Sequence, residues 1–153
     1  MAWASKLPGA IDGLVAVLGA SPGLSGVKVL DGPSTSQQTM KEVLTVGWTG
    51  QDDETDAEST LVTEGLGGSP DREQFTIRCA AAVLRGTDDL PGARRRAYEL
   101  LTEAGAAIAA NRTLRGAVMR AMVGSHSLAQ DLTQQGAQVT VIFEVSCDAY
   151  TGA

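Results

Sequence analysis

The chain contains few of the residues on which catalytic and metal sites depend. Its only histidine is His126, so one chain cannot assemble a histidine metal cluster, and no serine or cysteine triad is expected from it. His126 lies among serine, glutamine and aspartate residues, where a solvated loop side chain is the simplest interpretation. We therefore expect no enzyme and no cofactor, although a site built from carboxylates and arginines of distant segments stays open as an alternative.

Cysteine is equally scarce. The two cysteines, Cys79 and Cys147, each lie in a strand-like run, and neither belongs to a CxxC pair. This excludes a disulfide-rich scaffold and favours two buried, small hydrophobic side chains in a reducing compartment over a metal or redox site. A disulfide stays geometrically possible if the two strands are neighbours.

Aromatic residues and an excess of basic residues are also missing. Aromatics make up only 4% of the chain, so the core must be built from alanine, valine, leucine and isoleucine. The net charge is −6 and the pI is about 4.7. A nucleic-acid binder normally presents a basic face to phosphates, so this balance argues against that function class.

No segment is long and apolar enough to cross a membrane. The stretch Ile11–Ala20 follows Lys6 and superficially resembles a signal peptide, but Asp12 and Gly13 interrupt it. We expect a helix of the mature protein, made in the cytoplasm. The Gly65–Ser69 stretch lacks the lysine of a phosphate-binding loop and predicts a flexible turn.

Two helices are predicted. The first carries an apolar stripe at helical spacing, with Pro8 in its first turn and Gly19 at its end. The second, from Pro91 to Ala110, begins after an N-cap at Asp88 or Asp89 and stops at Asn111. The stripe of the first helix consists of Leu7, Ile11, Leu14, Val15 and Leu18. Both helices are expected to cover one face of a sheet.

Strand patterns fill most of the remaining chain. The predicted strands are 27–30, 42–48, a brief strand within 59–66, 73–84, a run that ends at Val123 and a final strand that ends near Tyr150. In the strand 42–48, Leu44, Val46 and Trp48 lie on one face. In the final strand Val139, Val141, Phe143, Val145 and Cys147 alternate with Gln138, Thr140, Glu144, Ser146 and Asp148. One face is therefore dry, and the other faces water or a partner.

These elements predict a single α+β domain over residues 1–153. Consecutive strands joined by short turns make the sheet mainly antiparallel, with an N-terminal helix and one long helix packed on it. A polar loop, Gly124–Gly136, is expected between the last two strands. It contains His126, Gln130 and Asp131, and it is the segment most expected to reach a neighbouring protein.

An acidic, glycine-rich excursion at about 49–71 interrupts the strand pattern. Five carboxylates gather in it: Asp52, Asp53, Glu54, Asp56 and Glu58. A solvated loop is the simplest interpretation, and the spacing does not match a calcium-binding loop, so no metal site is predicted. The run can also keep DNA from a channel wall or contact a neighbouring subunit.

Three arginines, Arg94, Arg95 and Arg96, lie near the start of the long helix, where positive charge opposes the helix dipole. Asp88 and Asp89 offset them in the simplest interpretation. Alternatively, the arginines form pairs with carboxylates of a partner. If the acidic run of one subunit met the arginines of the next, the contact would be head-to-tail and could close a ring.

The order of elements from Asp88 onward resembles the tail terminator and minor tail proteins of long-tailed bacteriophages and related contractile tail-like particles. The resemblance is clearest in Ala121-Met-Val-Gly through Leu128-Ala-Gln, in Thr133-Gln-Gln-Gly-Ala137 and in Val141-Ile-Phe-Glu-Val-Ser-Cys147. These motifs are structural, and because members of the family are not enzymes, the resemblance assigns no catalytic residue.

The resemblance implies a virion protein without enzymatic activity. It would form a ring, hexameric in the family, that caps the tail tube, stops its polymerisation and presents a surface to the head connector. The implied partners are further copies of the chain, the tube protein and the neck protein, while DNA passes through without sequence-specific binding. Another neck or tube protein is the alternative, followed by a small ligand-binding domain.

Overall fold

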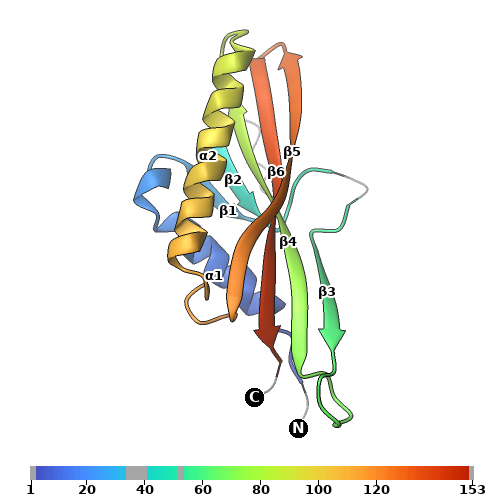
Figure 1. The fold of residues 1–153 in the computed structure, drawn as a ribbon. Coiled ribbons are helices and arrows are strands. Elements are labelled where there is room, and N and C mark those ends of the chain that lie inside the picture. The colour runs from blue at the N-terminus through green and yellow to red at the C-terminus, as the bar shows by residue number, and fades with distance from the viewer. Residues whose placement is uncertain (1–2, 34–40, 52–53, 152–153) are drawn as a thin grey trace.

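The computed structural model describes residues 3–33, 41–51 and 54–151. Two helices pack against a six-stranded sheet whose order is β1-β2-β4-β6-β5, with β3 beside β4 (Figure 1). The elements in chain order are α1 (Leu7–Gly19), a 3₁₀ turn (Pro22–Leu24), β1 (Lys28–Asp31), β2 (Glu42–Val46), β3 (Ala57–Val62), β4 (Arg72–Leu84), α2 (Leu90–Ala110), β5 (Arg120–Thr133) and β6 (Gly136–Tyr150). The predicted α+β class, with both helices on a mainly antiparallel sheet, is confirmed.

The long strands β4 and β6 form the middle of the sheet. They pair antiparallel along their whole length, from Arg72 opposite Tyr150 to Leu84 opposite Gln138. On its other side, β4 pairs with β3 over residues 72–77 and with β2 over residues 79–83. Along this side of β4, β3 therefore pairs with the first half of the strand, and β2, with β1 beside it, pairs with the second half.

One strand pair departs from the predicted antiparallel arrangement. Strands β1 and β2 are parallel, with Lys28 opposite Val43. Parallel neighbours cannot be joined by a tight hairpin turn, because the chain must return to the same end of the sheet. The expectation that short turns join consecutive strands is therefore wrong for this pair.

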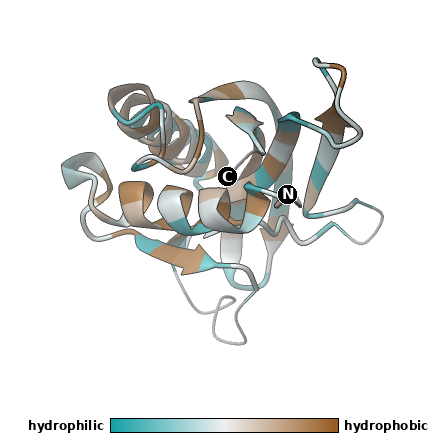
Figure 2. Ribbon diagram, turned by 90° about the horizontal axis from the view of Figure 1, so that it is seen from below, coloured by the Kyte–Doolittle hydropathy of each residue, from teal (hydrophilic) through white to brown (hydrophobic). Residues whose placement is uncertain are grey.

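The core lies between the sheet and the two helices. The predicted dry faces are confirmed: the alternate residues Val139 to Cys147 of β6 and Phe75 to Val83 of β4 are buried. Hydrophobic and hydrophilic residues alternate along the helices and strands when the molecule is seen from below (Figure 2). The other face of the sheet carries the polar row of β6, which the helices leave uncovered.

Local features explain where the helices lie. The carboxylate of Asp89 accepts a hydrogen bond from the Gly92 amide at 3.0 Å, which identifies the N-cap of α2, and Asn111 ends the helix as predicted. In α1, a Cβ on Gly13 would lie 2.4 Å from the carbonyl oxygen of Leu114. This close approach requires glycine and brings α1 against the segment that follows α2.

The predicted polar loop at 124–136 is wrong. Strand β5 continues to Thr133, with a bulge between Val123 and Ser125, and pairs with β6 until Thr133 lies opposite Gly136. The segment is polar because β5 is an edge strand, of which only Ala121 is buried and only Val123 and Thr133 are partly buried. An exposed edge strand and an exposed loop are both rich in polar residues, so composition alone does not distinguish them.

Two further boundaries differ from the sequence prediction. Gly47 has a φ of +74° and follows the last residue of β2, so Trp48 lies outside the strand. Within the predicted excursion, β3 spans Ala57–Val62 rather than the 59–66 region, and it pairs with β4. The excursion is thus an edge strand with loops before and after it.

The two cysteines are buried and free, as their positions in the strands indicated. Cys79 lies opposite Phe143, and Cys147 lies opposite Phe75. The offset of four residues separates the cysteines by about 13 Å along the strands, which is beyond the reach of a disulfide. Burial raises the pKa of each thiol to about 12.

Candidate functional site

The interface residues predicted from the sequence lie in separate parts of the fold. Glu54, Asp56 and Glu58 lie on or beside β3, the polar residues of β5 lie at the opposite edge of the sheet, and the arginines lie on α2, where Arg94 contacts β5 and Arg96 contacts β2. Asp52 and Asp53 lie outside the described residues. The acidic run and the arginines therefore do not form one site within a single chain.

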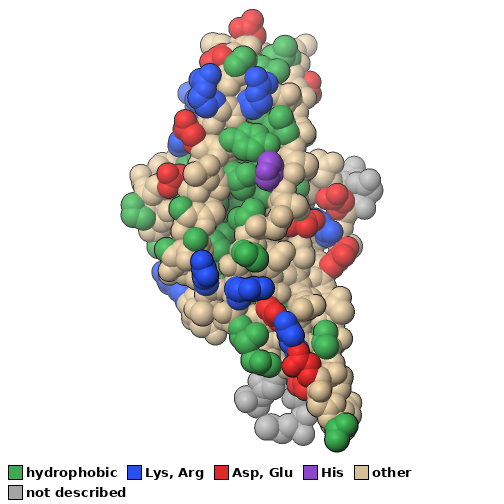
Figure 3. Space-filling view, viewed as in Figure 1, with side chains coloured by type: hydrophobic (Ala, Val, Ile, Leu, Met, Phe, Trp, Pro, Cys, Tyr) green, Lys and Arg blue, Asp and Glu red, His purple; other side chains and the backbone are tan. Residues whose placement is uncertain are grey.

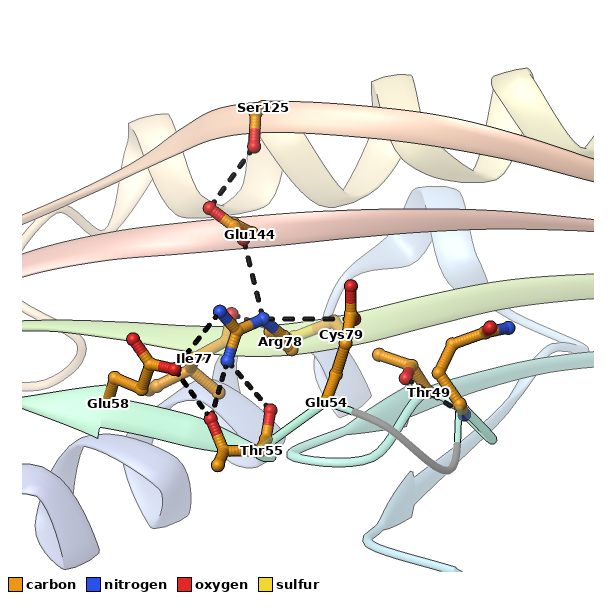
Figure 4. Close-up of polar contacts among 10 residues, drawn as sticks. Thr49, Glu54, Thr55, Glu58, Ile77, Arg78, Cys79, Ser125 and Glu144 are labelled. Carbon is orange, nitrogen blue, oxygen red and sulfur yellow. Dashed lines mark hydrogen bonds and ion pairs between the residues drawn. The ribbon is translucent and has the colours of Figure 1, made fainter.

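Arg78 joins the acidic run to the outer face of the sheet (Figure 4). Its guanidinium donates to the Thr55 carbonyl oxygen at 2.7 Å and to the Thr55 hydroxyl at 2.9 Å. Three carboxylates surround it: Glu144 at 3.5 Å, Glu58 at 3.6 Å and Glu54 at 3.9 Å. One cation among three anions leaves this region negatively charged.

A second arginine of β4 lies further along the same face. The Arg72 guanidinium donates from Nε to Asp148 at 2.8 Å and from Nη1 to Glu64 at 2.7 Å. Its contact with Asp148 holds the pKa of that carboxyl below its usual range, and burial opposes the shift only in part. The pair joins β4 to β6, and Glu64 attaches the loop after β3.

We define the acidic edge as β3 together with residues 54–56 before it and 63–71 after it. Residues 54–71 contain five carboxylates, Glu54, Asp56, Glu58, Glu64 and Asp71, and no lysine or arginine. Exposed apolar side chains lie among them: Leu61 is 40% exposed, and Leu66 is fully exposed. The edge therefore combines negative charge with uncovered leucines.

Glu73 holds the acidic edge to the rest of the fold. This buried carboxylate accepts hydrogen bonds from the hydroxyls of Ser59 at 2.6 Å and Ser5 at 2.7 Å, and from the Lys6 amide at 2.7 Å. Burial raises the pKa of Glu73, but the hydrogen bonds outweigh burial and leave the pKa below its ordinary value. The residue links β3, β4 and the segment before α1.

The arginines near the start of α2 have different surroundings. Arg96 forms a two-point contact with Glu42 of β2 and also contacts Glu99, and this contact lowers the pKa of Glu42. Arg94 donates to Gln130 at 2.6 Å, and Arg95 is exposed. Among the described residues no salt bridge joins Asp88 or Asp89 to these arginines, and the partners of Arg96 are instead Glu42 and Glu99.

His126 is placed on β5 and not in a loop. Its Nδ1 lies 3.3 Å from the Tyr98 hydroxyl, and the two rings meet edge-on with centroids 5.4 Å apart. This contact and the bond between Arg94 and Gln130 attach the outer strand to α2. Asp131 lies further along β5 and is exposed.

Hydrophobic side chains gather along the strip between α2 and β5 (Figure 3). Leu128 and Leu132 of β5 are 40% and 58% exposed. At the opposite end of the strip lies a surface hollow of about 250 Å³. It is lined by Gly105, Ile108, Ala109, Arg112, Arg120, Ala121, Met122 and Val123. Apolar surface is therefore uncovered beside this edge too.

We define the basic edge as β5 together with residues 112–119 that precede it. Residues 112–130 contain Arg112, Arg115 and Arg120 and no carboxylate. All three arginines are exposed, and within the described part of the chain none has a salt-bridge partner. The two edges of the sheet thus carry opposite charge.

Other features offer less chemistry. A hollow of about 320 Å³ lies between the ends of α1 and α2, lined by Glu103, Asn111, Arg115 and mostly small residues. Over residues 3–33, 41–51 and 54–151 no group of three or more histidine, cysteine or acidic side chains is placed to hold a metal ion. In the same ranges no helix has the length and hydropathy needed to cross a membrane.

Sequence reasoning missed several residues of these edges. Arg72 and Arg78 looked like ordinary strand residues, yet each contacts carboxylates from more than one segment of the chain. Their alternation with Phe75 and Ile77 was the available signal, because it places both on the face away from the core. Leu128 and Leu132 were missed because a loop was expected around them.

Comparison of the sequence with protein-family models gives no match, and neither does comparison with the curated proteins.

Proposed function

We propose that this protein is a structural component of a phage tail, a terminator whose copies form a ring, hexameric as in the family it resembles. One observation carries the proposal: two of the edge strands of the sheet, β3 and β5, lie in regions of opposite charge, each with uncovered apolar side chains. Such edges favour contact between unlike surfaces of identical chains, and head-to-tail contacts of this kind close into rings. No comparable arrangement for catalysis occurs among the described residues.

In this proposal the ring caps the tail tube and stops its growth. The face turned to the head connector completes the joint between head and tail. The chain contributes a rigid α+β body, whose outer strands are held to α2 by Arg94 and His126. Rigid subunits suit this role because a terminator must present a fixed surface to two different partners.

The uncovered sheet face suits a lumen through which DNA passes. Two of its arginines are already paired, Arg78 with three carboxylates and Arg72 with Asp148 and Glu64, and the third, Arg120, lies opposite Asp148 in the strand register. Phosphates therefore find little free positive charge there, and the chain as a whole carries −6. Repulsion of this kind favours passage over binding.

The alternatives predict different particles. A tube protein would stack into filaments, whereas a head-completion protein would join the connector rather than the tube end. A ligand-binding domain would need an enclosed apolar pocket, but the two described hollows lie at the surface. No specific feature of the fold favours any of these over the terminator.

Native mass measurement combined with negative-stain imaging tests the proposal. Purified protein, alone or mixed with tube ends, should give discrete rings, and mass analysis of purified particles should detect a few copies per tail. Filaments of the protein alone would favour the tube alternative. Absence of the protein from purified particles would contradict the proposal.

A further inference from the structure

We infer that the ring forms by edge-to-edge strand pairing, in which β3 of one copy adds antiparallel to the first residues of β5 of the next copy. This inference rests on the proposed ring and names the surfaces that build it. The partner is therefore a second copy of this chain. Four features of the described residues support this choice.

The first feature is the free backbone of both strands. Among the described strands, β3 pairs only with β4 and β5 pairs only with β6. An edge strand leaves half of its backbone donors and acceptors unpaired, which makes it a template for another strand unless charges, prolines or cover protect it. Between Arg120 and Asp131, β5 contains no proline and no other charged residue.

The second feature is strand direction. Strand β3 is antiparallel to β4, β4 to β6, and β6 to β5. Strand β5 therefore runs opposite to β3, and a neighbour in the same orientation would extend the sheet by one more antiparallel pair. The helix-covered faces of both copies would then lie on the same side of the continuous sheet.

The third feature is the shared level of the two edges. Register connects Glu58 through Thr76 and Ser146 to Met122, and Thr60 through Gln74 and Asp148 to Arg120. In a closed ring, neighbouring copies are not displaced along the ring axis. Residues that share a register position across the sheet therefore meet at the contact, and Thr60 of one copy would lie opposite Arg120 of the next. Head-to-tail contacts with a rise would give filaments instead.

The fourth feature is the match of side chains in that register. Glu58 and Arg120 would become diagonal neighbours on the uncovered face, which is within reach of a long ionic pair. At the next level, Leu61 would lie near Met119, and these side chains are 40% and 41% exposed in the single chain. Charge would therefore pair with charge and apolar surface with apolar surface.

Charge also disfavours the symmetric alternatives. Two acidic edges would bring the carboxylates at 54–64 against one another, and two basic edges would do the same with Arg112 and Arg120, which lie together beside the start of β5. Like charges directly opposite in a strand pair are destabilising. Of the three ways to join these two edges, only the head-to-tail contact pairs opposite charges.

Cysteine cross-linking tests this inference. Thr60→Cys with Met122→Cys in one chain places a thiol on each edge, and both positions are exposed. A short bismaleimide should convert the ring into a covalent ladder that ends at the ring size found by native mass. The native cysteines should not interfere, because both are buried.

Three controls define the outcome. Each single variant should give no ladder, and a mixture of the two single variants should stop at dimers. Thr60→Cys with Ser127→Cys should cross-link poorly, because Ser127 lies about 20 Å along the edge from Arg120, the residue that would lie opposite Thr60. A ring that forms but cross-links only through Ser127, or not at all, would overturn the inferred pairing and leave the proposed function standing. Protein that stays monomeric even with tube ends would overturn both.

Discussion

Arg96 and Glu42 form a two-point contact that joins the first part of α2 to β2, with Nε 2.7 Å from Oε2 and Nη2 3.1 Å from Oε1. The sequence places these residues 54 positions apart, and neither spacing nor motif connects them. Both side chains are about a quarter exposed. The contact identifies Arg96 as part of the fold, whereas the sequence alone offered an offset by Asp88 and Asp89 or an interface role.

Replacing Arg96 should therefore lower stability without a direct effect on assembly. Arg96→Ala is expected to reduce the free energy of unfolding by about 1 kcal/mol, a value kept low because solvent screens the pair. Arg95→Ala is the matched control, and its exposed side chain predicts a change near zero. Urea unfolding at pH 7 measures both. Equal losses from the two variants would contradict the role of the Glu42 contact.

The same pair gives a pH dependence. The Glu42 pKa is lowered by its bond to Arg96, so the stabilisation is present above the ordinary value of 4.5 and is lost as pH falls through the folded pKa. The difference in unfolding free energy between the wild type and Glu42→Gln should shrink as the pH drops below about 4. A difference that stays constant down to pH 2 would argue against an ionic contribution.

Glu73→Gln tests whether the acidic edge depends on its buried carboxylate. The amide can accept fewer hydrogen bonds than the carboxylate that now receives three, so stability should fall by about 1–3 kcal/mol. Loss of the Ser59 and Ser5 bonds should also loosen β3, which hydrogen exchange of its amides would detect. Asp131→Asn, at an exposed position of β5, is the control and should leave both readouts unchanged.

Two glycines of α1 offer a matched pair with opposite expectations. Gly13→Ala would place a Cβ 2.4 Å from the Leu114 carbonyl oxygen, so it should destabilise the fold by about 1–3 kcal/mol. The Cβ of Gly9→Ala meets no atom within 4 Å. This variant should stabilise the fold by about 0.5–1 kcal/mol, because alanine has less conformational freedom than glycine in the unfolded chain. Thermal unfolding of both variants measures the difference. A tolerated alanine at position 13 would show that α1 can shift away from Leu114.

Reversing one charge of the basic edge should weaken assembly and leave the fold intact. Arg112→Glu changes an exposed side chain with no salt-bridge partner among the described residues. Association should weaken by about threefold to tenfold at low salt, and the difference should narrow as ionic strength rises. Lys28→Glu on β1 is the control because it lies on neither of the two charged edges. Equal weakening by both variants would point to net charge rather than to this edge.

Periodicity predicted the parts of the fold that are buried on one side. Alternation in β4 and β6 predicted the buried faces of both strands, because burial leaves a repeating apolar pattern. The predicted stripe of α1 included the buried Leu14 and Leu18 but missed Ala10 and Val17. Edge strands carry no such pattern. Strand β5 was therefore predicted as a loop beyond Val123, and β3 as part of an excursion.

The candidate site was predictable only in part, for a related reason. Charge runs marked Glu54 to Glu58 and the arginines of α2, but charge alone does not reveal its partners. Arg78 and Glu73 act through residues far away in the sequence, and only the strand register brings those residues together. Pairing across β4 thus decides which carboxylates belong to the fold and which remain free for a neighbour.

Tail length in particles that lack this protein tests the central claim most directly. Disruption of its gene in the producing phage, followed by electron microscopy, should give tails that are overlong or irregular and are not joined to heads. Supplying the protein in trans should restore a single tail length and infectivity. Tails of normal, uniform length joined to full heads in its absence would contradict a terminator function.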